Sequence, residues 1–259
     1  MKNCKICDSE LSHVFDHKVM GKYDSSYFNC PKCGYMTVTN PHWLEEAYSD
    51  SITSADIGLL SRNIQLSHKV AVLTGRYLDV QGNYLDYAGG YGVFTRLMRD
   101  AGFSFYHDDP YTENLFAKDF EYRDFDGTIS AVTCFECLEH FVDPLVELEK
   151  VFQISKNAFF TTRLKPMGVP DLDWDYYAFD HGQHVSFYTE KALQAIARRF
   201  GLHVVSAGNL HFFSEMPTSS NGFRYFARRA DKRPHVFAKR TRFESLIRKI
   251  KKSHANKWK

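Results

Sequence analysis

The segment NYLDYAGGYGVFTRLMRDAG, residues 83–102, decides the fold because its hydrophobic pattern changes at a glycine-rich turn. Residues 84–87 predict a short strand, residues 88–92 a turn, and residues 93–99 a helix that Gly102 ends. A strand that runs into a helix through such a turn is typical of α/β proteins. In these proteins the ligand lies beyond the carboxyl ends of the strands.

Strands and helices alternate along the rest of the chain. Further strands are predicted at 103–110, 128–141, 157–164 and 202–210, and helices at 57–78, 144–155 and 189–201. This alternation predicts an α/β fold with a doubly wound, mostly parallel sheet that helices cover on both faces.

Four cysteines near the amino end form two closely spaced pairs. Cys4 and Cys7 are separated by two residues, and so are Cys30 and Cys33. Two intervening residues let both sulfurs of a tight turn face one ion, and four thiolates complete the tetrahedral shell of zinc without an open position. We therefore expect a structural zinc site in a small module whose folding depends on the metal.

Charge is distributed unevenly along the chain. The formal net charge is +2, but residues 222–259 hold seven Lys and seven Arg against two acids, a net charge of +12 that leaves −10 for the rest. No apolar stretch is long enough to span a bilayer, and the first residues do not resemble a signal peptide, so we expect a cytoplasmic protein.

The basic tail is expected to form an amphipathic helix, because apolar residues recur at helical spacing from Phe243 to Ile250. One hypothesis is a solvated helix that packs weakly on the body. A second is peripheral attachment to the inner face of an anionic membrane or to an anionic, lipid-linked acceptor. RNA is a third partner that the positive charge would attract.

Two carboxylates flank the glycine-rich turn. Asp86 ends the first strand, and Asp109 ends the second, where a carboxylate can accept both hydroxyls of a ribose. No Lys or Arg lies between Asp86 and Thr95, and Thr95 replaces the third glycine of the dinucleotide-binding pattern G-x-G-x-x-G. The site therefore suits a cofactor that has a ribose and an ammonium group but no pyrophosphate.

These residues resemble the class I S-adenosylmethionine-dependent methyltransferases. LDYAGGYG (85–92) is similar to their D-x-G-x-G-x-G signature, DDP (108–110) to their second-strand acid, and FECLEHFVDP (135–144) to the E-x-L-E-H-x-x-D-P run after the fourth strand. There are two departures. Ala88 replaces the usual first glycine, and the connection 110–125 is too short for the usual helix and third strand.

The resemblance covers about residues 48–215, and it implies an enzyme that uses S-adenosylmethionine (SAM) as its cofactor. It also implies cofactor contacts from the turn, the second strand and the run after the fourth strand. These residues are Asp86, Ala88, Gly89, Gly90, Gly92, Asp109, Pro110, Phe135, Glu136 and His140. Phe116 or Phe135 is expected to pack on the adenine ring.

A four-cysteine module that precedes such a domain is similar to the arrangement in the sugar C-methyltransferases of deoxysugar pathways. The shorter layout is similar to methyltransferases of surface-polysaccharide and natural-product clusters. In the deoxysugar enzymes an N-terminal tyrosine reaches the methionine end of the cofactor, and Tyr48 resembles it. We therefore expect a zinc-binding module at 1–48 that forms a lid or docking platform, a methyltransferase domain at 49–221 and a basic tail at 222–259.

The stretch DLDWDYYAFDHGQHVSFYTE, residues 171–190, is expected to lie at the carboxyl edge of the sheet and to contact the acceptor. His184 is predicted to be the general base, with His181 as the second candidate, because histidine titrates near neutral pH. The aromatic residues that would wall a sugar-like acceptor are Tyr176, Tyr177, Phe187 and Tyr188.

Two alternatives stay open for this stretch. Either histidine could be a structural residue that is satisfied by its neighbours. Both could instead hold a divalent cation that polarises the acceptor oxygen, together with the alternating aspartates Asp171, Asp173, Asp175 and Asp180.

Three functions are compatible with the sequence. The first is O-methylation of a small saccharide, a nucleotide sugar or a surface-polysaccharide precursor such as a lipid-linked glycan. The second is C-methylation of a deoxysugar. The third is a zinc-ribbon RNA-binding protein with a degenerate methyltransferase fold. The N/D-P-P-Y/F tetrapeptide of amino-methylating enzymes is absent, and nucleic acid is not the partner we expect.

Overall fold

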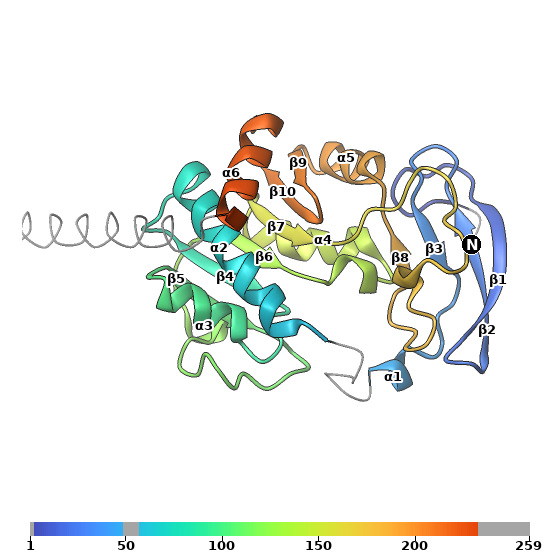
Figure 1. Ribbon diagram of the computed structural model, residues 1–259, viewed down its shortest axis with the longest axis horizontal. Coiled ribbons are helices and arrows are strands. Elements are labelled where there is room, and N and C mark those ends of the chain that lie inside the picture. Colours follow the sequence, from blue (N-terminus) through green and yellow to red (C-terminus); the bar gives the residue numbers. More distant parts are fainter. Residues whose placement is uncertain (1–2, 49–56, 233–259) are drawn as a thin grey trace, which may run out of the picture. The chain divides into compact units, whose positions relative to one another are not determined.

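The computed structural model describes residues 3–48 and 57–232 of the chain (Figure 1). The described residues fall into two compact units. The glycine-turn unit comprises residues 57–133 and 219–232, and the cysteine unit comprises residues 3–48 and 134–218. The domain boundaries 1–48, 49–221 and 222–259 stay a prediction.

The glycine-turn unit is built on parallel strands. β4 (Asn83–Tyr87) pairs in parallel with β5 (Ser104–Asp108) on one side and with β6 (Ile129–Cys134) on the other. This register places Asp86 opposite His107 in β5 and Thr133 in β6. The helices of the unit are α2 (Leu59–Tyr77), α3 (Val93–Asp100) and α6 (Ser220–Lys232).

Helix α3 follows the turn because the sequence presents one apolar face and one charged face. Phe94 and Met98 are buried and lie four residues apart, whereas Arg96 and Asp100 form an exposed ion pair across one helical turn. Between Asp108 and Ile129 the described residues contain a short 3-10 helix, η1 (Tyr122–Asp124), and no strand. The prediction that this connection is too short for a full helix and third strand is confirmed.

The cysteine unit begins with a small antiparallel sheet. Its strand order is β1-β2-β3-β8, and β8 comes from a segment far along the chain. The strands are β1 (Ser12–Val19), β2 (Tyr23–Asn29), β3 (Met36–Val38) and β8 (Ser186–Phe187). The short helix α1 (Leu44–Ala47) follows β3.

A second set of elements completes the cysteine unit. The helices are η2 (Leu138–His140), α4 (Pro144–Ile154), η3 (Asp175–Tyr177) and α5 (Glu190–Arg199). The strands β7 (Ala158–Thr161), β10 (Leu210–Ser214) and β9 (His203–Ala207) pair antiparallel in the order β7-β10-β9. The single strand predicted at 202–210 is therefore wrong. Gly208 adopts a left-handed φ of +62° and turns the chain back, so two strands form.

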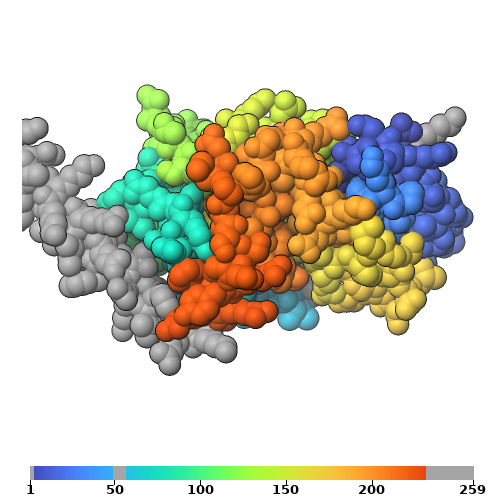
Figure 2. Space-filling view, turned by 90° about the horizontal axis from the view of Figure 1, so that it is seen from above, coloured from blue at the N-terminus to red at the C-terminus, as the bar shows by residue number. Residues whose placement is uncertain are grey.

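A single hydrophobic core joins the amino-terminal module to the segment 171–190. Nine buried residues form this shared core: Val19, Tyr27, Met36, Val38, Trp43, Ala47, Tyr177, Val185 and Phe187. The indole Nε1–H of Trp43 donates a hydrogen bond of 2.8 Å to the carbonyl of Gly182. Figure 2 shows the blue amino-terminal residues against the yellow residues of the later segment. The module is thus packed onto the segment that carries the predicted base.

The parallel pairing of β5, β4 and β6 and the alternation with helices confirm the predicted α/β fold with a mostly parallel sheet. The four-cysteine cluster at the amino end is present as well. Among the described helices, none combines the length and the apolar character that crossing a bilayer requires.

Candidate functional site

Asp86 is buried next to the glycine-rich turn. Its Oδ1 accepts a hydrogen bond of 2.9 Å from the hydroxyl of Thr133, and its Oδ2 accepts one of 3.0 Å from the hydroxyl of Thr95. Burial raises the pKa of this carboxyl to about 6. A Cβ at position 89 would lie 2.7 Å from Asp86 Oδ2, so only glycine fits there.

His107 and Asp109 hold the same turn from β5. The ring Nε2–H of His107 donates to the carbonyl of Gly90 at 2.7 Å, while the Gly90 N–H donates to Asp109 Oδ2 at 2.9 Å. Asp109 Oδ1 also accepts from the N–H groups of Tyr111 and Thr112, both at 2.9 Å. A carboxylate has about four lone-pair positions, so Asp109 retains acceptor capacity for a ribose hydroxyl.

Sequence reasoning missed two of these residues. It did not single out His107, whose only signal was a polar residue in an apolar strand just before two aspartates. It also passed over Asp108, which is half-buried at the end of β5 and whose carboxyl pKa is raised by burial. Asp108 is therefore a second candidate for the ribose contact.

The turn adopts a backbone shape that favours glycine. Ala88, Gly90 and Gly92 have φ angles of +54°, +55° and +81°. Ala88 therefore occupies a left-handed conformation that costs an L-residue about 1–2 kcal/mol. The glycine that usually stands at this position in the class I signature would adopt this conformation without that cost.

The cysteine unit gathers a second group of predicted residues. One carboxylate oxygen of Glu139 and one ring nitrogen each of His140 and His184 lie within 4.8 Å of one another. The Tyr176 hydroxyl donates to Glu139 Oε1 at 2.7 Å, and the Tyr48 hydroxyl and His140 Nδ1 form a hydrogen bond of 2.6 Å. We call Glu139, His140 and His184 the Glu-His-His cluster.

Burial shifts the acid–base properties of the Glu-His-His cluster. It raises the pKa of Glu139 to about 8, and the nearby Glu136 carboxylate acts in the same direction. Burial lowers the pKa of His140 to about 3 and that of His184 to about 4. Both imidazoles are therefore uncharged at neutral pH, and each keeps a lone pair.

The two predicted base candidates differ in their hydrogen bonds. The Nδ1–H of His184 donates to the carbonyl of Tyr176 at 2.7 Å, which leaves the lone pair on Nε2. His181 Nδ1 instead accepts the N–H of Gln183 at 3.3 Å. The two rings meet edge to face with centroids 5.3 Å apart, so the structure brings both candidates together.

The other residues predicted to contact the acceptor lie in different surroundings. Tyr177 and Phe187 are buried in the shared core, and Tyr188 is buried with its hydroxyl donating to the carbonyl of Leu138. Of the predicted aromatic wall, Tyr176 alone contacts the Glu-His-His cluster through a hydrogen bond to a side chain. The aspartates at 171, 173, 175 and 180 do not belong to the cation-ligand groups found among the described residues.

The remaining residues predicted to contact the cofactor differ in their exposure to solvent. Phe135 and Glu136 are half-buried, and Glu136 has a left-handed φ of +52° while its N–H donates to Thr161 Oγ1. Pro110 is exposed, as is Phe116, the alternative partner of the adenine ring.

The four amino-terminal cysteines converge on one point. The Sγ atoms of Cys4 and Cys33 are 3.6 Å apart, those of Cys7 and Cys30 are 3.4 Å apart, and one ion could reach all four. A tetrahedral zinc ion with bonds of about 2.3 Å would separate its sulfurs by about 3.8 Å. The donor set and its dimensions therefore fit zinc.

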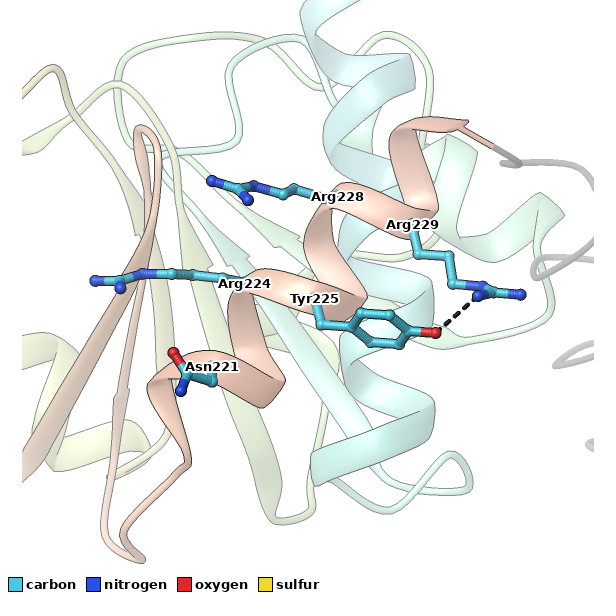
Figure 3. Close-up of a pocket in the computed structure, with 5 residues that line it drawn as sticks. All are labelled: Asn221, Arg224, Tyr225, Arg228 and Arg229. Atoms are coloured by element: carbon cyan, nitrogen blue, oxygen red, sulfur yellow. Dashed lines mark hydrogen bonds between the residues drawn. The ribbon is translucent and has the colours of Figure 1, made fainter.

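A hollow on the outer face of α6 is lined by none of the predicted site residues. Figure 3 shows its lining, in which Arg224 and Arg228 extend in one direction while Arg229 donates to the hydroxyl of Tyr225. Four of its five lining residues belong to the described part of the predicted basic tail, residues 222–232. The helix predicted from Phe243 to Ile250 lies outside the described residues.

Replacing Ala88 with Gly should stabilise the protein. The change removes the left-handed strain at this position and adds some backbone freedom in the unfolded chain, so we expect a net gain of about 0.5–1 kcal/mol. Thermal unfolding of purified A88G should show the increase in Tm. The matched control is Ala101→Gly, at a φ of −75°, which should lower Tm instead. A decrease for both variants would contradict the strain at Ala88.

Comparisons with known proteins assign the chain to a family. A family model described as a methyltransferase domain matches residues 61–207, more than half of the chain. No curated protein matches. Similar solved structures include magnesium protoporphyrin IX methyltransferase from Synechocystis PCC 6803 with bound S-adenosylhomocysteine (SAH), at 14% identity. That match covers 67% of this chain and 93% of the other, with a TM-score of 0.42.

Two further structures show the same level of similarity. A SAM-dependent methyltransferase from Thermotoga maritima, a possible histamine N-methyltransferase, is 12% identical over 67% of this chain and 95% of the other, with a TM-score of 0.43. Human N-acetylserotonin methyltransferase is 13% identical over 66% and 64%, with a TM-score of 0.40. These structural similarities are too distant to support an argument on their own. The match to the family model establishes that the chain belongs to the methyltransferase-domain family and is a SAM-dependent methyltransferase.

Proposed function

We propose that this methyltransferase methylates a hydroxyl oxygen of a small, sugar-like acceptor, such as a saccharide, a nucleotide sugar or a surface-polysaccharide precursor. The observation that carries the proposal is the Glu-His-His cluster with the hydroxyls of Tyr48 and Tyr176 beside it. Carboxylate, imidazole and phenol groups in one place are suited to bind a hydroxylated ligand and to assist loss of a hydroxyl proton.

The residues around the glycine-rich turn fit the cofactor. The backbone of residues 88–92 would lie against SAM, and Asp109 or Asp108 would accept the ribose hydroxyls. When bound, SAM supplies an electrophilic methyl group on a positively charged sulfur. Asp86 and His107 contribute by fixing the turn, because their polar atoms bond to residues of the protein.

The acceptor hydroxyl must lose its proton as the new O–C bond forms. In one form of the proposal His184 takes this proton through Nε2, with His181 as the second candidate. The hydrogen bond from His184 Nδ1–H to the Tyr176 carbonyl supports this role because it fixes the tautomer. A C-methyltransferase of a deoxysugar is the second candidate function. It rests on the four-cysteine cluster that precedes the methyltransferase domain.

We also propose that the four cysteines hold a structural zinc ion and that the module is a platform for the acceptor segment. Thr189 donates its hydroxyl hydrogen to the carbonyl of Cys33, and the Gln183 side chain donates to the carbonyl of Ala47 at 2.7 Å. Together with the Trp43–Gly182 bond, these contacts tie the module to both sides of His184. The zinc ion would act on the reaction through the position of this segment.

Replacing Asp109 with Ala should weaken SAH binding by about 10-fold to 100-fold, because hydrogen bonds to a charged group contribute about 1.5–3 kcal/mol. Isothermal titration calorimetry measures the effect. Asp100→Ala is the matched control, since Asp100 is exposed and pairs with Arg96. Equal affinity of D109A and the wild type would exclude Asp109 as the ribose contact. A loss in Asp108→Ala would then assign that contact to its neighbour.

Saccharide acceptors should cause release of SAH from SAM. We would incubate the full chain with nucleotide sugars and lipid-linked glycans and measure SAH by mass spectrometry. NMR of the product distinguishes an ether methyl group from a carbon-bound one, and so distinguishes the two candidate functions. SAM binding without SAH release from any saccharide, together with release from another acceptor class, would contradict the proposal.

The purified protein should contain one zinc ion per chain, and Cys30→Ser should lose it. Loss of zinc should also increase hydrogen exchange in residues 176–189, because the module and this segment share one core. Cys137→Ala is the matched control, since this buried cysteine lies outside the four-cysteine cluster. Full zinc content in C30S would contradict the proposed zinc site. Unchanged hydrogen exchange in residues 176–189 after zinc loss would contradict the proposal that the module is a platform for this segment.

A further inference from the structure

We infer that Glu139, His140 and His184 bind a divalent transition-metal cation, and that the open coordination positions of this cation take the acceptor hydroxyl. The acceptor part of the inference rests on the proposed function. The metal site itself stands on the geometry of the cysteine unit. It is separate from the four-cysteine cluster and from the aspartates of segment 171–190.

The distances between the ligand atoms suit one cation. The three atoms lie within 4.8 Å of one another. A cation with bonds of about 2.1 Å separates neighbouring ligands by about 3 Å and opposite ligands by about 4.2 Å. The three atoms would therefore move toward one another, by up to about 1 Å each, when a cation binds. Glu139 and His140 are adjacent in η2, and His184 comes from the segment packed onto the amino-terminal module.

An unsatisfied oxygen supports the site independently of the spacing. The Glu139 side chain is almost fully buried, with 1% of the residue exposed, and Oε1 accepts the hydrogen bond from Tyr176. Oε2 has no partner at hydrogen-bond geometry among the described residues, although the Thr162 hydroxyl is near enough to lower the pKa of the carboxyl. No Lys or Arg in the described part of the chain forms an ion pair with Glu139. Leaving such an oxygen without a partner is costly, and a cation would satisfy it.

Hydrogen bonds orient both histidines, and that of His184 is of the kind that metal ligands usually make. His184 donates Nδ1–H to the Tyr176 carbonyl, and His140 Nδ1 is bonded to the Tyr48 hydroxyl. The bond of His184 fixes its ring and leaves the lone pair of Nε2 for a metal. The ring of His140 also has a hydrogen bond to the backbone of Gln183, which it would give up or share on binding a cation. Tyr176 thereby contacts two of the three ligands, through its hydroxyl and its carbonyl.

The chemistry of the three ligands selects the class of ion. Two imidazoles and one carboxylate favour Mn²⁺, Fe²⁺, Co²⁺ or Zn²⁺, and they leave coordination positions for water or substrate. A hydroxyl on such a cation has a lowered pKa and loses its proton to solvent. The oxygen lone pair then forms the bond to the methyl carbon, and the electrons of the S–C bond return to sulfur. In this form of the mechanism His184 is a ligand and not the base.

Metal binding by the full chain tests the site directly. We would titrate Mn²⁺ and Co²⁺ into zinc-loaded protein by calorimetry and follow free Mn²⁺ by electron paramagnetic resonance. Mn²⁺ disfavours thiolates, so its signal reports a site other than the cysteines. We expect one ion per chain in the wild type and at least a 10-fold loss of affinity in Glu139→Gln and His184→Ala. His203→Ala, which removes an exposed histidine, should bind as the wild type does.

A second measurement tests whether the variants still fold and still bind SAH. E139Q keeps an acceptor for the Tyr176 hydroxyl, so its Tm and SAH affinity should match the wild type in the absence of added metal. Wild-type protein that binds neither Mn²⁺ nor Co²⁺, or E139Q and H184A that retain full affinity, would overturn the inference.

Activity assays distinguish the inference from the proposed function. If the chain binds the cation but methylates no saccharide, the proposed function fails while the metal site stands. If a saccharide is methylated equally well after chelation of the metal, and H184A still abolishes turnover, His184 is the base and the metal is not used. Recovery of turnover on adding Mn²⁺ to chelated wild type, but not to H184A, is the result we expect.

Discussion

The shared core between the amino-terminal module and segment 171–190 is the constraint on which the position of the Glu-His-His cluster depends. A small antiparallel sheet needs a hydrophobic face or a packing partner to be stable in water. It gains a fourth strand from β8 and buries Tyr177, Val185 and Phe187 of the same segment. Because these residues lie on both sides of His184, burying them also fixes where the histidine stands. The module and the segment that carries His184 therefore depend on the same core.

The glycine-rich turn depends on a different kind of interaction. A glycine-rich turn has few side chains with which to hold its own shape, so its neighbours must hold its backbone. His107 bonds to the carbonyl of Gly90, and Asp109 bonds to the N–H of the same residue. Buried Asp86 leaves room only for a glycine at position 89. His107 and Asp109 therefore hold the backbone of a turn whose own sequence is permissive.

Local patterns were sufficient to predict the fold. The strand, turn and helix at 83–100 follow from changes in hydrophobic period, and the cysteine cluster follows from two identical spacings. What could not be predicted depends on tertiary contacts. Nothing local indicates that Tyr48 would meet His140, 92 positions later, or that Glu139 would be buried beside His184. Sequence reasoning also extended the strand at 202–210 across Gly208 and did not predict β10, since a glycine in an apolar run does not reveal whether the chain turns.

Asp86 and Glu139, the two buried carboxylates among residues 3–48 and 57–232, show that burial alone does not indicate a role. Asp86 and Glu139 are 2% and 1% exposed, and burial raises the pKa of both. Asp86 uses both oxygens on threonine hydroxyls, so it has no need of a further ligand and is best understood as a support. Glu139 uses one oxygen on Tyr176 and leaves the other without a partner among the described residues. Since an unpaired buried oxygen is costly, it persists where binding compensates for it. The count of hydrogen bonds, and not the degree of burial, therefore separates the structural acid from the one expected to hold a ligand.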